Sequence, residues 1–106
     1  MIDFLIRAHN EATWLPLLFK SIANQKDIKL GNILLLDNKS KDKPENIKNL
    51  FPDLKIIYEK FDEKYLPGRM LNYGINILKR KSNKEDFVCI VSGHCFFEDK
   101  NSLKYY

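Results

Sequence analysis

Three short runs along the chain are largely apolar at successive positions rather than at alternate ones: Ile2–Ile6, Ile33–Leu36 and Phe87–Val91. A fourth run at Lys55–Tyr58 is weaker. Continuous apolar runs are typical of parallel strands that are buried on both faces of a sheet. The pattern therefore predicts four strands of one mainly parallel sheet.

The segments between these runs have the spacing of amphipathic helices. Apolar residues recur with a helical period over about Ala12–Gln25 and Gly68–Arg80, and a shorter helix is expected over Pro44–Leu50 with its proline in the first turn. Another helix is expected to begin after Asp99. Strands that alternate with helices predict an α/β fold, here a Rossmann-like three-layer α/β/α sandwich with strand order 3-2-1-4.

Polar residues stand directly after three of the predicted strands. His9–Glu11 follows the first strand, Asp37–Ser40 the second and Ser92–Cys95 the fourth. Open parallel sheets bind ligands at the carboxyl ends of their strands, where the winding direction reverses. With strand order 3-2-1-4 the reversal lies between the first and last of these loops, so His9, Asn10 and His94 are expected to face one crevice, with Asp37 one strand away.

Composition limits the class of protein. The 106 residues suit a single domain, and 44% hydrophobic with 30% charged residues excludes a protein that is mainly embedded in a membrane. The N-terminus has neither the basic segment nor the apolar run of a signal peptide or membrane span. The net charge of +4 is scattered, so it favours an anionic small molecule over nucleic acid.

Two cysteines, Cys89 and Cys95, have no spacing typical of a zinc site. They are expected to be reduced, which indicates a cytoplasmic protein. A position at the inner face of the membrane is compatible with this.

Several motifs, in this order and spacing, resemble the family 2 glycosyltransferases. The residues that carry the resemblance are Arg7–Glu11, a helix with Leu15, Leu18, Ser21, Ile22 and Gln25, then Ile33–Asp42, Gly68–Ile75 and Asp86–Val91. The resemblance covers nearly the whole chain. It implies the A-type (GT-A) nucleotide-diphospho-sugar transferase fold, with residues 1–106 as the donor-binding domain, incomplete at its C-terminus.

In that family the loop after the first strand and the acid after the second hold the nucleotide. The resemblance therefore implies nucleotide contacts for His9, Asn10, Glu11 and Asp37. The residues themselves leave other roles open. Asp37 is also the ordinary cap of a turn after a strand, His9 can be a hydrogen-bonded loop histidine, and Glu11 can complement the dipole of the helix that follows.

The predicted third helix carries one cationic candidate. Arg69 stands near its start and could bind a diphosphate bidentately, the alternative being a surface salt bridge. Asn72 and Gly74 are expected to set the packing of this helix on the sheet.

The main departure from the family lies at Ser92–Cys95. Where most members place two carboxylates that bind a divalent cation, this chain has Ser92, Gly93 and His94, so dependence on Mn²⁺ or Mg²⁺ stays open. His94 could ligate an ion with help from Glu98, Asp99 or the substrate phosphates, replace the ion as imidazolium, or only shape the crevice.

The resemblance implies transfer of a sugar from a nucleoside diphospho-sugar to a carbohydrate or lipid-linked acceptor, with inversion, in synthesis of a surface polysaccharide or related glycan. No catalytic base is assigned, because the family places it beyond the Asp-x-Asp region. The runner-up is a non-catalytic nucleotide-binding or protein-interaction module that self-associates through an open sheet edge. A small hydrolase using Cys95 and a histidine is a distant third possibility.

Overall fold

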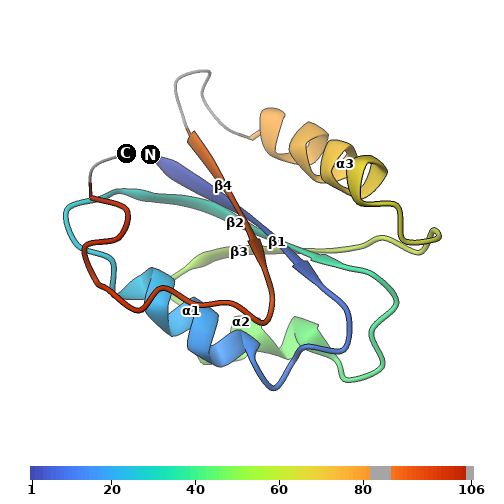
Figure 1. Ribbon diagram of the computed structural model, residues 1–106, viewed down its shortest axis with the longest axis horizontal. Helices are drawn as coiled ribbons and strands as arrows, with labels where there is room; N and C mark the ends of the chain where they lie inside the picture. The colour runs from blue at the N-terminus through green and yellow to red at the C-terminus, as the bar shows by residue number, and fades with distance from the viewer. Residues whose placement is uncertain (82–86, 105–106) are drawn as a thin grey trace.

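The fold is built on a four-stranded sheet. The computed structural model describes residues 1–81 and 87–104. Its strands are β1 (Ile2–Ala8), β2 (Leu30–Asp37), β3 (Lys55–Lys60) and β4 (Phe87–Ser92). They pair in parallel in the order β3-β2-β1-β4 (Figure 1). The predicted four strands and their order 3-2-1-4 are therefore confirmed.

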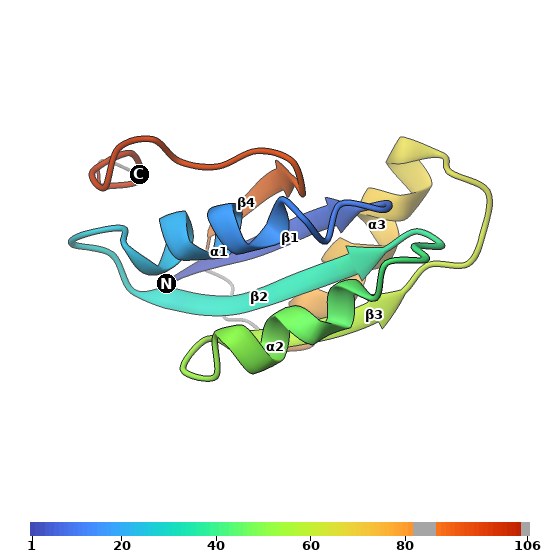
Figure 2. The same ribbon diagram turned by 90° about the horizontal axis from the view of Figure 1, so that it is seen from below.

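Helices cover both faces of this sheet. α1 (Leu15–Ala23) and α2 (Ile47–Leu50), the latter preceded by the 3-10 helix η1 (Pro44–Asn46), lie on one face, and α3 (Pro67–Lys79) lies on the other. Figures 1 and 2 show this arrangement from two directions. The predicted three-layer sandwich is thus confirmed, with an α1 shorter at both ends than its apolar spacing indicated.

The core is divided by β1 and β2, whose side chains alternate between the two faces. Phe4 and Ile6 pack with Leu18 and Ile22 of α1, whereas Leu5 packs on the other face with Met70 of α3. Every one of these side chains is buried. Burial on both faces explains why the strand sequences are apolar at successive positions.

Gly74 allows α3 to approach the sheet closely. A Cβ atom at this position would lie 2.6 Å from Leu5 Cδ1 and 3.3 Å from Leu36 Cδ2. The predicted packing role of Gly74 is confirmed, because any larger residue would have to push two buried leucines aside.

The chain after β4 returns along α1 and is attached by side chains of that helix and of the residues directly after it. Gln25 is buried, donates to the Asp99 carbonyl at 2.8 Å and accepts from the Leu103 amide at 3.0 Å. Ser21 Oγ accepts from the Phe97 amide at 3.0 Å. These contacts hold residues 99–104 in consecutive turns, so the helix expected after Asp99 is wrong for the described residues.

None of the helices within residues 1–81 and 87–104 is long and apolar enough to span a membrane.

Candidate functional site

A crevice of about 140 Å³ lies at the carboxyl ends of β1 and β4. This is the point where the strand order reverses, because β2 lies on one side of β1 and β4 on the other. Its lining comes from β1 and the loop after it, the end of β2, the loop before α3, α3 itself and the loop after β4: Arg7, Ala8, His9, Glu11, Asn38, Tyr65, Met70, Ser92 and His94. It is smaller than the roughly 300–1,000 Å³ of typical ligand pockets, so a nucleotide-sized ligand would extend beyond it.

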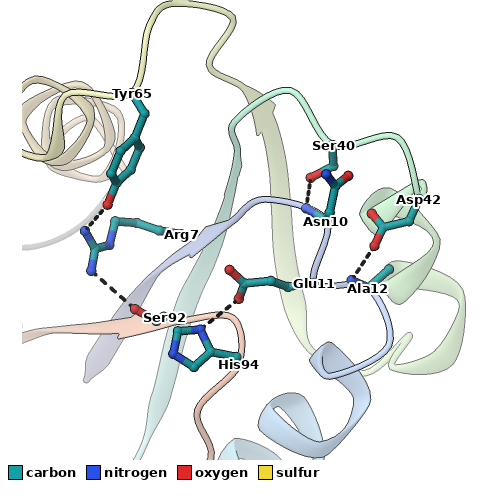
Figure 3. A network of polar contacts seen from close by, with 9 residues as sticks. All are labelled: Arg7, Asn10, Glu11, Ala12, Ser40, Asp42, Tyr65, Ser92 and His94. Carbon is teal, nitrogen blue, oxygen red and sulfur yellow. Dashed lines mark hydrogen bonds and ion pairs between the residues drawn. The ribbon is translucent and has the colours of Figure 1, made fainter.

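Glu11 and His94 meet across this crevice. The Nδ1 atom of His94 lies 3.3 Å from Glu11 Oε2, with the imidazole side chain 61% exposed and the carboxylate side chain 22% exposed (Figure 3). Gly93 makes room for this pair, because a Cβ at Gly93 would lie 2.6 Å from the same carboxylate oxygen. The crevice thus joins two loops that are more than 80 residues apart, as the sequence predicted for His9 and His94.

The loop after β1 is held by the loop after β2. His9 Nδ1 donates to the Asn38 carbonyl, and the Asn10 side-chain amide donates to His9 Nε2 at 3.3 Å. Asn10 itself adopts a left-handed backbone with φ of 52°, accepts from the Lys41 amide at 2.8 Å and donates its own amide to Ser40 Oγ at 2.9 Å. Asn10 therefore fixes the turn, and His9 presents its ring at the rim of the crevice.

Asp37 caps the turn that follows β2, the role that was given as the alternative to a nucleotide contact. Its carboxylate is buried, with one oxygen accepting from the Tyr58 hydroxyl and the other from the Ser40 amide at 3.0 Å. It does not line the crevice, whereas the next residue, Asn38, does. Burial and the hydrogen bond to Asp37 raise the pKa of Tyr58 well above its ordinary value.

Arg69 also lies outside the crevice. Its guanidinium is 3.1 Å from Glu63 Oε1, and both side chains are largely exposed. The structure therefore shows the surface salt bridge that was weighed against diphosphate binding. Asn72 is exposed on the same helix and does not line the crevice either.

A cation does lie in the crevice, and it is Arg7. Its guanidinium donates to Tyr65 Oη at 3.0 Å and to Ser92 Oγ at 3.3 Å (Figure 3). Arg7, Asn38 and Tyr65 were not predicted as site residues. The available signal was Arg7 itself, a charged residue that ends an apolar strand directly before a polar loop.

The donor set for a divalent cation is small. No group of three or more His, Cys, Asp or Glu side chains converges anywhere in residues 1–81 and 87–104. Glu11 and His94 together supply two ligands, while Glu98 lines a different hollow beside Lys20 and Asn24 of α1. The help that His94 was expected to receive from Glu98 or Asp99 is therefore absent among the described residues, and these side chains do not by themselves fit a metal centre.

The cysteines give no nucleophilic centre. Both are free, Cys89 half-buried in β4 and Cys95 exposed after it. Burial raises the pKa of the Cys89 thiol, which lowers its thiolate fraction at neutral pH. In the part of the chain that is described, no hydrogen bond joins the Cys95 thiol to His9 or His94.

Solved structures share this fold. The chain is similar to S. aureus TarS in complex with UDP, with a TM-score of 0.77 and 18% identity over 98% of this chain and 30% of that one. It is also similar to the mannosyltransferase PcManGT from Pyrobaculum calidifontis in complex with GDP-Man and Mn²⁺, with a TM-score of 0.74 and 18% identity over 97% of this chain and 30% of that one. This chain therefore spans less than a third of either transferase.

The sequence comparisons give the family. No curated protein sequence matches the chain. The family model described as glycosyl transferase family 2 matches residues 3–104, nearly the whole length, and the parallel sheet of order β3-β2-β1-β4 agrees with it. The chain belongs to glycosyl transferase family 2.

Proposed function

We propose that the protein transfers a glycosyl group from a nucleoside diphospho-sugar to an acceptor hydroxyl, and that this chain carries the donor-binding part. The observation that supports this most directly is the crevice at the strand-order reversal, where His9, Glu11 and His94 gather at the ends of β1 and β4. This is where open parallel sheets bind nucleotides. Family membership agrees with the proposal.

Each wall of the crevice can serve a different part of such a donor. The ring of His9 can lie against a nucleotide base, while Asn10 holds the turn that presents it. Ser92 and His94 lie on the other wall, where a hydroxyl and an imidazole can bind phosphate oxygens. TarS and PcManGT, in complexes with UDP and with GDP-Man, show the chemical class of ligand to test here.

The finer points of the proposal come from the family resemblance. They are an inverting displacement, a carbohydrate or lipid-linked acceptor, and a role in synthesis of a surface polysaccharide or related glycan. Among the described residues we assign no catalytic base. Two free cysteines agree with a reducing, cytoplasmic setting, which we include in the proposal.

Titration calorimetry with uridine and guanosine diphosphates, each with and without Mn²⁺, tests donor binding. At least one nucleotide should bind, and His9→Asn should weaken binding by about tenfold, because asparagine can still donate to the Asn38 carbonyl but lacks the ring. Asn24→Ala, at an exposed residue beyond the end of α1, is the control. Failure to bind either nucleotide, or equal binding by the His9 variant, would count against the donor site.

A second candidate, a nucleotide-binding interaction module without catalysis, is favoured by the exposed apolar side chains of β4. Phe87, Val88 and Ile90 are 62%, 40% and 45% exposed, on a strand at the edge of the described sheet. Exposed apolar edge strands are sites of pairing with other chains. The two candidates differ in turnover: only a transferase should slowly release nucleoside diphosphate from the sugar nucleotide it binds, with water as acceptor.

A further inference from the structure

The guanidinium of Arg7 lines the crevice. Arg7 is the penultimate residue of β1, the strand that pairs with both β2 and β4. Its side chain lies on the same face of the sheet as Leu5 and extends toward the loop before α3. Figure 3 shows it between Tyr65 on that loop and Ser92 at the end of β4. Two separate elements therefore hold the guanidinium in one position.

The hydrogen bonds of Arg7 leave its charge without a balancing anion. A guanidinium has five N–H donors. Two of them go to neutral oxygens, Tyr65 Oη and Ser92 Oγ. The Nε atom is buried with no hydrogen-bond partner among the residues that the structure describes, and no carboxylate there forms an ion pair with Arg7. A half-buried charge in this situation gains free energy from an anionic ligand.

The other charged residues of the crevice do not take this role. Glu11 lines the same crevice but pairs with His94 on the far side of it. Among the described residues that line the crevice, Arg7 is the one arginine or lysine, and its guanidinium stays charged at every physiological pH. Arg69, the cation that the sequence favoured, pairs with Glu63 at the surface.

We propose that Arg7 is the residue that binds the diphosphate of the donor, with Ser92 and Tyr65 as its positioning residues. This inference rests on the proposed function, since the diphosphate is part of the donor. The free N–H groups can hold two phosphate oxygens in the bidentate geometry that guanidinium favours. In the transfer step the acceptor hydroxyl oxygen bonds to the anomeric carbon of the sugar and gives up its proton to water or buffer, while the bond between the sugar and the diphosphate breaks with its electron pair on the diphosphate oxygen. Arg7 stabilises the negative charge that develops there.

The test separates the phosphates from the rest of the nucleotide. Calorimetry compares nucleoside, monophosphate and diphosphate in the uridine and guanosine series, using wild type, Arg7→Gln, Arg7→Lys and the control Lys48→Gln. Lys48 is an exposed residue of α2, so its variant loses the same charge outside the crevice. Arg7→Gln should weaken diphosphate binding by about tenfold or more and leave nucleoside binding unchanged. Arg7→Lys should weaken diphosphate binding less, because lysine keeps the positive charge but lacks the paired N–H donors of the guanidinium.

Each other outcome has one meaning. If wild type binds no nucleotide, the proposed function fails. If wild type binds a nucleoside diphosphate and both Arg7 variants bind it as tightly, the assignment of Arg7 is overturned while the donor site stands. Equal losses for nucleoside and diphosphate also overturn the assignment, because they indicate a contact with base or ribose. If Arg7→Gln does not fold, the same comparison with Arg7→Lys decides, and a loss confined to the phosphorylated ligands supports the assignment.

Discussion

The Tyr58 hydroxyl of β3 donates a hydrogen bond to the Asp37 carboxylate at the end of β2. Asp37 in turn caps the next turn through the Ser40 amide. Tyr58→Phe should therefore lower the free energy of unfolding by about 1–3 kcal/mol, because a buried carboxylate oxygen loses its donor. Chemical denaturation at pH 8 measures this loss of stability. The matched control is Tyr73→Phe, at an exposed tyrosine of α3.

The same pair gives a pH dependence. Burial and Asp37 raise the pKa of Tyr58 in the folded chain, so the folded state keeps this proton after the unfolded state has lost it. The free energy of unfolding should then fall as the pH rises above about 10, the ordinary pKa of tyrosine. The gap in stability between wild type and Tyr58→Phe should narrow from pH 8 to pH 11. A gap that stays constant over this range would contradict the assignment.

The close approach of α3 to the sheet predicts opposite results for two glycines. Gly74→Ala should cost about 1–3 kcal/mol of stability, because the new methyl meets buried Leu5 and Leu36. Gly68→Ala, on the first turn of the same helix, meets no atom within 4 Å and should leave stability unchanged or raise it by up to about 1 kcal/mol. Thermal denaturation of both variants checks this; equal losses would mean that contact with the sheet is not the cause.

Gln25 is expected to control the order of the chain after β4. Gln25→Ala removes the donor to Asp99 and the acceptor from Leu103. A buried amide and a partly buried carbonyl then lose partners, at a cost of about 1–3 kcal/mol. Hydrogen exchange should accelerate at the Leu103 amide, while Asn24→Ala on the exposed side leaves it slow. Unchanged protection in the Gln25 variant would show that apolar contacts alone hold this segment.

Mn²⁺ should bind the nucleotide-free chain only weakly, since Glu11 and His94 are the two candidate ligands that the described residues bring together. The electron paramagnetic resonance signal of free Mn²⁺ should stay nearly unchanged on addition of protein alone. If the protein removes that signal without nucleotide, and the His94→Ala variant does not, His94 is instead identified as a metal ligand.

The sheet could be predicted from the sequence because strands that are buried on both faces have nearly continuous apolar runs. Ile33–Leu36 is apolar at every position and Ile2–Ile6 at every position but Asp3, and a polar loop follows soon after each. Their order along the chain, with helical segments between them, then limits the topology to a few arrangements. The meeting of the loops that contain Glu11 and His94 follows from that order alone.

The cation of the site could not be chosen in the same way. Arg69 and Met70 are neighbours on α3, yet Met70 lines the crevice and Arg69 faces solvent, because one residue turns a helix by about 100°. In the crevice the guanidinium of Arg7 donates to the hydroxyl of Tyr65, which is 58 residues away in the sequence. Such a contact depends on how the loop before α3 is placed on the sheet, which no local pattern contains.

The role of Asp37 could not be predicted from the sequence for a related reason. An acid after a buried strand serves equally well as a cap or as a ligand contact, and its neighbours in space decide between the two. Tyr58, on the next strand of the sheet, donates to one oxygen of Asp37, and the Ser40 amide donates to the other.

The residues that line the crevice belong partly to the sheet and partly to loops. Arg7 belongs to a strand with hydrogen-bonded neighbours on both sides, so the position of its backbone cannot shift without disturbing the whole sheet. Tyr65 and His94 belong to loops. Tyr65 is 49% exposed, and His94 is exposed as well. Attempts to change which ligand this chain accepts should therefore begin with libraries at these two loop positions, leaving the strand sequence untouched.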